Sequence, residues 1–105
     1  MADFVTVAKA DDIPPGQVRV YEVGDRRIAL CNVGGTLYAI DDVCTHDGGP
    51  LDQGELAGDQ IECPRHGARF DVRTGRALTL PAVRPVGTYP VQVQGNEVMV
   101  SVNSA

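Results

Sequence analysis

Short alternating runs of apolar and polar residues fill the first forty positions of the chain and predict β-strands. The run from Ala10 to Gly16 holds two prolines and a glycine, so it is expected to be a loop. Gly34-Gly35 is a two-residue hairpin signal between two such runs. The expected strands are 4–8, 18–23, 26–33 and 36–40. Three or four antiparallel strands therefore precede position 41.

The same alternation returns after Pro85. A strand is expected over 89–94, Gly95-Asn96 forms a turn, and Val98, Val100 and Val102 line one face of a last strand. No helical period of useful length occurs anywhere in the chain. The pattern predicts an all-β fold in a single domain, 1–105, with an antiparallel β-sandwich as its base.

The segment from about 41 to 84 interrupts this sheet pattern and is expected to be an inserted β subdomain. Short strands are predicted at 60–63 and 69–72, with turns at Gly58-Asp59 and Thr74-Gly75. The order of strands, insert and strands suggests that the first and last parts of the chain pair around the insert.

Two short loops of this segment each offer one thiol and one imidazole. Cys44-Thr45-His46 and Cys63-Pro64-Arg65-His66 are separated by sixteen residues and contain both histidines of the chain. A structural zinc site usually draws like ligands in pairs. A [2Fe–2S] centre with two cysteines on one iron and two histidines on the other suits mixed pairs, because each loop can give one ligand to each iron.

Cys44, His46, Cys63 and His66 are therefore predicted to bind one [2Fe–2S] cluster, with a mononuclear zinc ion as the alternative. The flanking residues agree with a cluster. Glycines let the backbone approach closely and adopt positive φ, and prolines stiffen the loops. These glycines and prolines are Gly48, Gly49, Gly67, Pro50 and Pro64.

The paired motifs Cys44-Thr45-His46 and Cys63-Pro64-Arg65-His66-Gly67 resemble those of the Rieske iron–sulfur family. The likeness extends through Phe70-Asp71-Val72, Thr74-Gly75 and Leu80-Pro81-Ala82 to about the last strand. In size the chain resembles the small Rieske ferredoxins that serve multicomponent aromatic-ring dioxygenases. The resemblance implies a Rieske-type fold and a soluble one-electron carrier. Such a carrier passes electrons from a flavin-dependent NAD(P)H reductase to a terminal non-haem iron oxygenase.

Within the same family, the alternative is the small Rieske-like subunit of an assimilatory nitrite reductase. The oxygenase itself is excluded, since its mononuclear iron needs two further histidines and a carboxylate, and no histidine is left. A zinc-stabilised binding module is the third class. The chain is expected to be a carrier and not an enzyme, with protein redox partners and no small-molecule substrate.

Charge counting explains why histidine ligation raises the reduction potential. Two ferric ions, two sulfides and two thiolates sum to zero, so an added electron costs less than with four thiolates. Potentials in this class run from about −150 to +300 mV. By the resemblance, respiratory Rieske proteins have Ser and Tyr donors at the places of Ala68 and Phe70, and cysteines of an extra disulfide at those of Gly49 and Arg65. Because Ala68 and Phe70 have no donor for sulfur, a potential in the lower half of the range is predicted.

The composition of the chain limits which partners and which location are expected. The chain has 105 residues and a formal net charge of −5, so nucleic acid is not an expected partner. It has no apolar run long enough for a membrane span and no signal-peptide pattern at its start, so we expect a cytoplasmic protein and a monomer. The third cysteine, Cys31, lies in the strand predicted at 26–33 and is expected to be a small buried hydrophobe.

Charge is unevenly distributed around the two loops. One hypothesis is that acids beside the His46 loop orient the cluster edge toward a basic partner; the other is an ordinary solvated surface. Between 41 and 62 there are seven acids and no base: Asp41, Asp42, Asp47, Asp52, Glu55, Asp59 and Glu62. Between 65 and 84 there are five arginines and one acid: Arg65, Arg69, Arg73, Arg76, Arg84 and Asp71.

Overall fold

The computed structural model describes residues 4–24, 26–42, 54–63, 67–79 and 84–101. Every strand pair in these ranges is antiparallel, and the described residues contain one 3-10 turn, η1 (Ala10–Asp12), and no α-helix. The strands are β1 Val5–Lys9, β2 Val18–Val23, β3 Arg26–Val33, β4 Thr36–Asp41, β5 Leu56–Ala57, β6 Gln60–Glu62, β7 Arg69–Asp71, β8 Thr88–Tyr89, β9 Val91–Gln94 and β10 Glu97–Val100. The predicted all-β class is confirmed.

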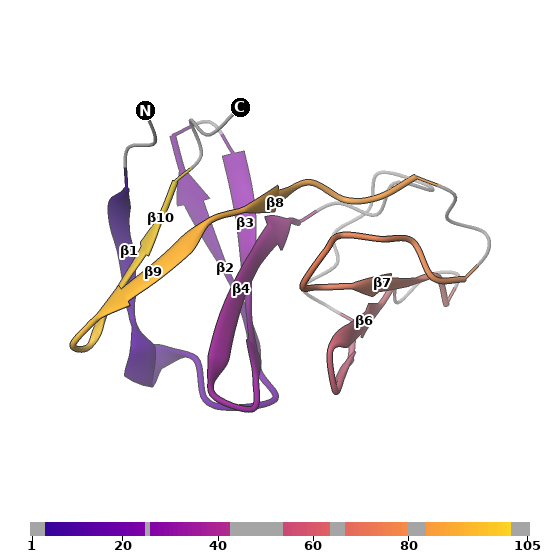
Figure 1. The fold of residues 1–105 in the computed structure, drawn as a ribbon, viewed down its shortest axis with the longest axis horizontal. Helices are drawn as coiled ribbons and strands as arrows, with labels where there is room; N and C mark the ends of the chain where they lie inside the picture. Colours follow the sequence, from indigo (N-terminus) through magenta and orange to yellow (C-terminus); the bar gives the residue numbers. More distant parts are fainter. Residues whose placement is uncertain (1–3, 25, 43–53, 64–66, 80–83, 102–105) are drawn as a thin grey trace.

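The strands form three sheets. An outer sheet has the order β1-β10-β9, a central sheet the order β2-β3-β4-β8, and a small sheet the order β5-β6-β7. Figure 1 shows the outer and central sheets together on one side and the small sheet on the other. The chain leaves the central sheet after β4, builds the small sheet, and returns to the central sheet at β8.

The middle of strand β3, from Ile28 to Cys31, is apolar at every position because both faces of the central sheet are covered. Ala29 and Cys31 point to one face, and Ile28 and Leu30 to the other, as the period of a strand requires. The first cluster contains, from the small sheet and the segments beside it, Ile61, Cys63, Ala68, Phe70, Val72 and Val86. The second contains Val98 and Val100 of the outer sheet, with Ile13, Val23, Leu37 and Ala39. The expectation that Cys31 is a buried hydrophobe is confirmed by its 0% exposure.

Proline explains where the sequence prediction of the last strands was wrong. The alternation predicted one strand over 89–94, but the structure divides it at Pro90 into β8 and β9. Proline has no N–H for a ladder hydrogen bond, so it ends one pairing and lets the chain change sheets. As a result, β8 pairs with β4 of the central sheet, and β9 pairs with β10 of the outer sheet. The turn η1 and the two-residue strand β5 were also not predicted.

Positive backbone angles confirm the predicted hairpin between β3 and β4. Gly34 and Gly35 have φ of 59° and 99°, which only glycine adopts readily at two successive positions. Gly95, predicted to turn the chain into the last strand, has φ of 61° between β9 and β10. In the described ranges, no helix has the length and apolar character needed to cross a membrane.

Candidate metal centre

Cys63 lies directly after β6, at the point where the small sheet reverses direction. Its backbone N–H donates to the carbonyl oxygen of Ala68 at 2.6 Å, and the N–H of Gly67 donates back to the carbonyl oxygen of Cys63 at 3.0 Å. Gly67 has φ of 75°, a left-handed conformation that favours glycine. Glu62 and Arg69 form the last strand pair below this loop. The hairpin therefore closes a short loop in which position 66 follows Cys63 by three residues.

The side chain of Cys63 faces the apolar interior. It is 1% exposed, and it belongs to the same cluster as Ala68 and Phe70, both 0% exposed. The thiol is not in a disulfide. A buried, unpaired thiol at the end of a rigid hairpin is a donor that fits an iron–sulfur cluster, whose irons are bound by cysteine thiolates. Neither Ala68 nor Phe70 brings a side-chain hydrogen-bond donor to this cluster of residues.

The other three predicted ligands, Cys44, His46 and His66, lie outside the described residues. So do four of the glycines and prolines named with them: Gly48, Gly49, Pro50 and Pro64. Within the described ranges, no group of three His, Cys, Asp or Glu side chains could hold a metal ion. The structure thus gives the position of one predicted ligand, Cys63, and the framework that carries the two loops.

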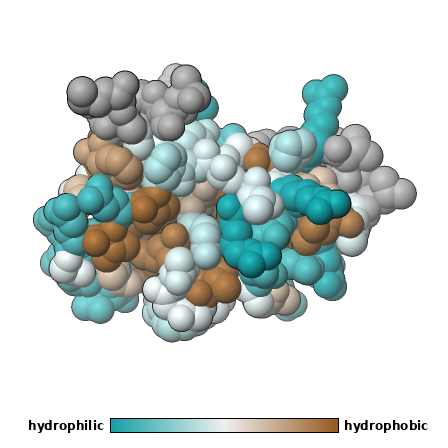
Figure 2. Space-filling model, in the orientation of Figure 1, coloured by the Kyte–Doolittle hydropathy of each residue, from teal (hydrophilic) through white to brown (hydrophobic). Residues whose placement is uncertain are grey.

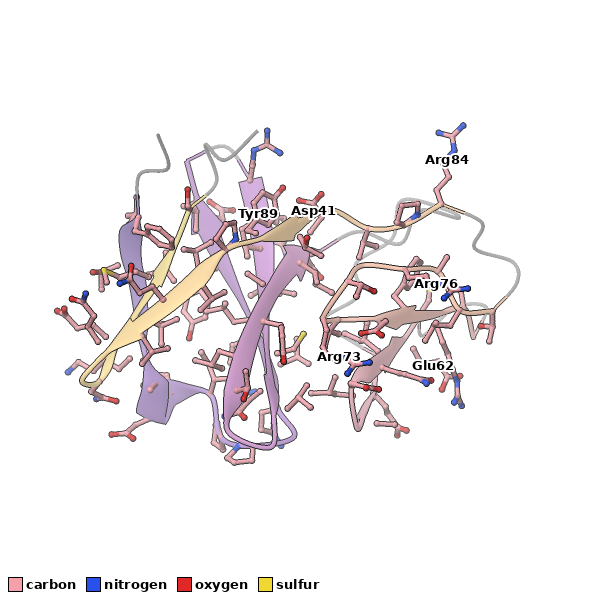
Figure 3. All side chains as sticks on the ribbon, in the orientation of Figure 1. Asp41, Glu62, Arg73, Arg76, Arg84 and Tyr89 are labelled. Atoms are coloured by element: carbon pink, nitrogen blue, oxygen red, sulfur yellow. The ribbon has the colours of Figure 1, made fainter. Side chains whose placement is uncertain are left out.

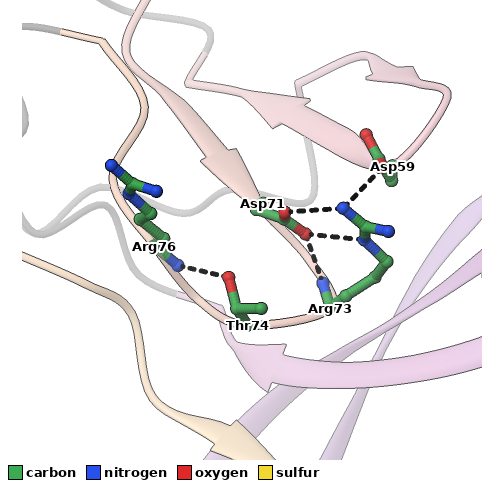
Figure 4. Close-up of polar contacts among 5 residues, drawn as sticks. All are labelled: Asp59, Asp71, Arg73, Thr74 and Arg76. Atoms are coloured by element: carbon green, nitrogen blue, oxygen red, sulfur yellow. Dashed lines mark hydrogen bonds and ion pairs between the residues drawn. The ribbon is translucent and has the colours of Figure 1, made fainter.

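A charged turn fixes the far end of the small sheet (Figure 4). The Asp71 carboxylate accepts hydrogen bonds from the backbone N–H of Arg73 at 2.9 Å, from its Nε at 3.2 Å and from its Nη2 at 3.1 Å. These bonds lower the pKa of Asp71. Nη2 of Arg73 also lies 3.0 Å from the Asp59 carboxylate in the β5–β6 turn. Arg73 therefore joins two turns of the small sheet.

Beyond this turn the chain runs back along β7. The N–H of Leu78 donates to the carbonyl oxygen of Arg69 at 2.8 Å, and the N–H of Arg69 donates to Thr79 Oγ1 at 2.9 Å. At the turn itself, the N–H of Val86 donates to the carbonyl oxygen of Gly75 at 2.8 Å. A Cβ atom at Gly75 would overlap the carbonyl oxygen of Val86, so this approach requires glycine. The outgoing chain is thereby attached to the small sheet.

Most of the described acids that follow β3 have partners within the chain. Asp42 is ion-paired with Arg27 at 3.1 Å, and Glu62 lies 3.6 Å from Arg69. Asp59 pairs with Arg73, and Asp41 accepts a hydrogen bond from the Tyr89 hydroxyl. The space-filling view shows hydrophilic residues gathered on the visible face of the small sheet (Figure 2).

The pairings around the strand ends were not predicted from the sequence. Asp41 and Asp42 were counted among the surface acids, and no role was expected for Arg26, Arg27 or Tyr89. The available signal was the pair of adjacent arginines at the start of one strand and the pair of adjacent aspartates at the end of the next. That signal does not identify partners, because the tyrosine lies 48 residues from Asp41 along the chain.

Comparisons with known proteins agree with the arrangement. The family described as Rieske [2Fe-2S] domain matches residues 3–90. The ferredoxin component of the naphthalene 1,2-dioxygenase/salicylate 5-hydroxylase systems of Ralstonia sp. is 43% identical over 97 residues, which are 92% of this chain and 93% of that protein. The chain belongs to the Rieske [2Fe–2S] domain family, and its cofactor is a Rieske [2Fe–2S] cluster.

Solved structures narrow the class. The ferredoxin of carbazole 1,9a-dioxygenase from Nocardioides aromaticivorans IC177 has a TM-score of 0.88 and 39% identity, covering 92% of this chain and 95% of that one. A ferredoxin chain in a complex of reduced oxygenase and oxidised ferredoxin of carbazole 1,9a-dioxygenase has a TM-score of 0.87 and 40% identity, covering 93% and 92%. The protein is thus a Rieske ferredoxin, an electron-transfer component of the dioxygenase type and not a catalytic oxygenase.

Proposed function

We propose that Cys44, His46, Cys63 and His66 hold the cluster, each loop giving one thiolate and one imidazole. The support is the mixed pairing of the two motifs and the closed hairpin that places the buried Cys63 thiol at the end of β6. When bound, the cluster takes up one electron and releases it again. The residues around Cys63 exclude water from its side chain, and its thiol is free.

The proposed organisation is one domain, 1–105, in which about 41–84 is an inserted cluster-binding subdomain. Support comes from the small sheet, since β5, β6 and β7 all fall between β4 and β8 of the central sheet. Base and insert share an apolar cluster, because Ala29 and Cys31 of β3 pack in the cluster that contains Phe70 of β7.

The electrons are proposed to come from a flavin-dependent NAD(P)H reductase and to pass to the terminal non-haem iron oxygenase of an aromatic-ring dioxygenase system. The observation that carries this proposal is the 40% identity to a ferredoxin that forms a complex with its oxygenase. The nitrite reductase alternative is less well supported, since relatives at about this identity are named as dioxygenase ferredoxin components. The protein is proposed to work as a monomer in the cytoplasm, where Cys31 stays a free thiol.

Loss of one ligand at a time tests the site. Iron and acid-labile sulfide, of which the wild type holds two each per chain, are expected to be lost in each of four variants: Cys63→Ser, Cys44→Ser, His46→Ala and His66→Ala. Cys31→Ala is the matched control, because it also removes a buried thiol but leaves the proposed ligands in place. One zinc per chain and no sulfide in the wild type would contradict the proposal.

Reconstituted electron transfer tests the cellular role. The dithionite-reduced protein should give an EPR spectrum whose average g value lies below that of an all-cysteine cluster. It should be reduced by a flavin-dependent reductase and reoxidised by a terminal oxygenase in the presence of its aromatic substrate. Stable copurification with a large sirohaem subunit, together with no turnover in the dioxygenase assay, would favour the nitrite reductase alternative instead.

A further inference from the structure

The insert is joined to the base at two chain crossings that lie side by side. The incoming crossing is Asp41-Asp42 at the end of β4, and the outgoing crossing is 86–89 before β9. The backbone N–H of Asp41 donates to the carbonyl oxygen of Gly87 at 2.9 Å, and β8 pairs with β4 directly above. A Cβ atom at Gly87 would overlap the Asp41 carboxylate, so the two crossings are in direct contact.

Asp41 and Tyr89, one from each crossing, lie next to each other (Figure 3), and a third polar group, from the start of β3, contacts Tyr89. The Tyr89 hydroxyl donates to the Asp41 carboxylate, and it accepts a hydrogen bond from Nη1 of Arg26 at 3.0 Å. The guanidinium of Arg26 also lies over the Tyr89 ring, 5.8 Å from its centre. Arg26, Asp41 and Tyr89 thus connect the base, the incoming crossing and the outgoing crossing.

The next residue of β3 binds the other aspartate of the incoming crossing. Nη2 of Arg27 donates to Oδ2 of Asp42 at 3.1 Å, and the N–H of Asp42 donates to the carbonyl oxygen of Arg27 at 3.1 Å. The Asp42 side chain is 0% exposed. Because Arg26 and Arg27 are consecutive in a strand, their side chains lie on opposite faces of that strand. Arg26 contacts Tyr89, the partner of Asp41, and Arg27 contacts Asp42.

Polar contacts at this junction are informative because apolar packing would hold the crossings together at lower cost. Burying a carboxylate such as that of Asp42 is expensive unless it is paired, so the Arg27–Asp42 pair is weak evidence for a gain in net stability. Hydrogen bonds fix angle as well as distance. Cys44 follows Asp42 by two residues in the sequence, so Asp41 and Asp42 are the last described residues before the first predicted ligand.

We propose that Arg26, Asp41 and Tyr89, together with the Arg27–Asp42 pair, form a neck clamp that positions the Cys44-Thr45-His46 loop for cluster binding. These are positioning residues, which act through the loop and do not touch the cluster. The inference goes beyond the electron-transfer role and does not depend on which partners the ferredoxin serves. It does rest on the proposed placement of Cys44 and His46 among the ligands.

The test compares cluster loss with unfolding in the holoprotein. Wild type, Tyr89→Phe, Asp41→Ala and Asp41→Asn are treated with excess iron chelator, and the decay of the visible cluster absorption is followed. Tyr89→Phe and Asp41→Ala are expected to lose the cluster about tenfold faster. Tyr89→Phe removes the hydrogen bonds of its hydroxyl with Asp41 and Arg26, and Asp41→Ala removes the charged acceptor of the first of these. Asp41→Asn is expected to stay within about threefold of wild type, because its amide oxygen still accepts the Tyr89 hydrogen bond.

Tyr21→Phe is the matched control. It removes a tyrosine hydroxyl from β2, which has no part in either crossing, and should leave the rate unchanged. Denaturant midpoints from far-UV circular dichroism and EPR line widths of the reduced cluster are measured on the same samples. Positioning predicts faster loss and broader lines with little change in midpoint.

Three results would overturn the clamp: wild-type rates in Tyr89→Phe and Asp41→Ala, equal rates in Asp41→Asn and Asp41→Ala, or an acceleration that only follows a fall in the midpoint. A wrong ligand assignment is detected separately. In that case Cys44→Ser or His46→Ala would keep full cluster content, whatever the rates of cluster loss in the clamp variants.

Discussion

Replacing Phe70 by tyrosine tests the link between the small sheet and the reduction potential. Phe70 is 0% exposed and shares its apolar cluster with the Cys63 thiol. Tyrosine keeps the ring and adds one hydroxyl, which is a hydrogen-bond donor. A donor to ligand sulfur favours the reduced state, because that state carries more negative charge. The potential of Phe70→Tyr is therefore expected to rise.

The size of the shift follows from the value of one such bond. A hydrogen bond to a charged group is worth about 1.5–3 kcal/mol. If roughly half of that value distinguishes the two oxidation states, the difference is about 0.8–1.5 kcal/mol, or about 30–65 mV for a one-electron couple. A hydroxyl that finds no partner in this fully buried position instead costs about 1–3 kcal/mol of stability. The two possibilities are thus separated by measuring potential and stability together.

Potentiometric titration of the visible spectrum gives the potential, and denaturant unfolding gives the stability. Phe4→Tyr is the matched control, since Phe4 is the other phenylalanine, lies before β1 and is 38% exposed. It should leave the potential where it is in the wild type. An intact cluster in Phe70→Tyr with an unchanged or lowered potential would refute the reasoning. So would a wild-type potential near the top of the class range, about +300 mV.

Three further predictions concern the framework and the surface. Gly75→Ala should lower the free energy of unfolding by more than about 2 kcal/mol, because a Cβ atom there overlaps the Val86 carbonyl oxygen. Gly95→Ala, also at positive φ but in open space, should lower it by about 1 kcal/mol. Equal losses in denaturant melts would contradict this. Burial, with a smaller effect of the Asp42 charge, raises the pKa of Cys31 from 9.0 to about 12. The contribution of the Cys31 thiol to the free energy of unfolding is therefore complete below about pH 9 and is lost as the pH rises toward 12. The loss is up to about 1.4 kcal/mol per pH unit, and Cys31→Ala should remove this slope from unfolding curves measured across that range. Glu55→Gln should weaken the salt dependence of electron transfer more than Asp59→Asn, because Glu55 is exposed and Asp59 is already paired with Arg73; equal salt slopes would count against steering by this acid.

Local patterns were sufficient for most of the fold. The boundaries of β2 and β3 and the Gly34-Gly35 hairpin follow from residue alternation and from one backbone requirement of glycine. The break at Pro90 was also readable, since proline cannot sit inside a paired strand, but the alternation around it concealed the change of sheet. Strand β5 is only two residues long and carries no alternation to detect.

The candidate site, like the fold, could be predicted from the sequence only in part. Ligand types and spacing are local, so Cys44, His46, Cys63 and His66 could be proposed as ligands from the sequence, and the burial of the Cys63 thiol fits that proposal. The neck clamp could not, because its strength comes from pairing residues that are 15 to 63 positions apart. Charge alone does not say whether an aspartate meets an arginine of the same chain or of a partner.

This difference changes how the acidic segment beside the cluster loops is understood. Four of its seven acids are already partnered within the chain: Asp41, Asp42, Asp59 and Glu62. A carboxylate paired with a guanidinium at about 3 Å, as in Asp42 and Asp59, contributes little field at the distance of an approaching protein, because the opposite charges nearly cancel and salt screens the remainder beyond about 10 Å. The count of seven acids therefore overstates the field that this segment can offer a partner. Any steering must come from the few that remain, of which Glu55 is the one in the described ranges, and single-charge variants should resolve it more clearly than changes in overall charge.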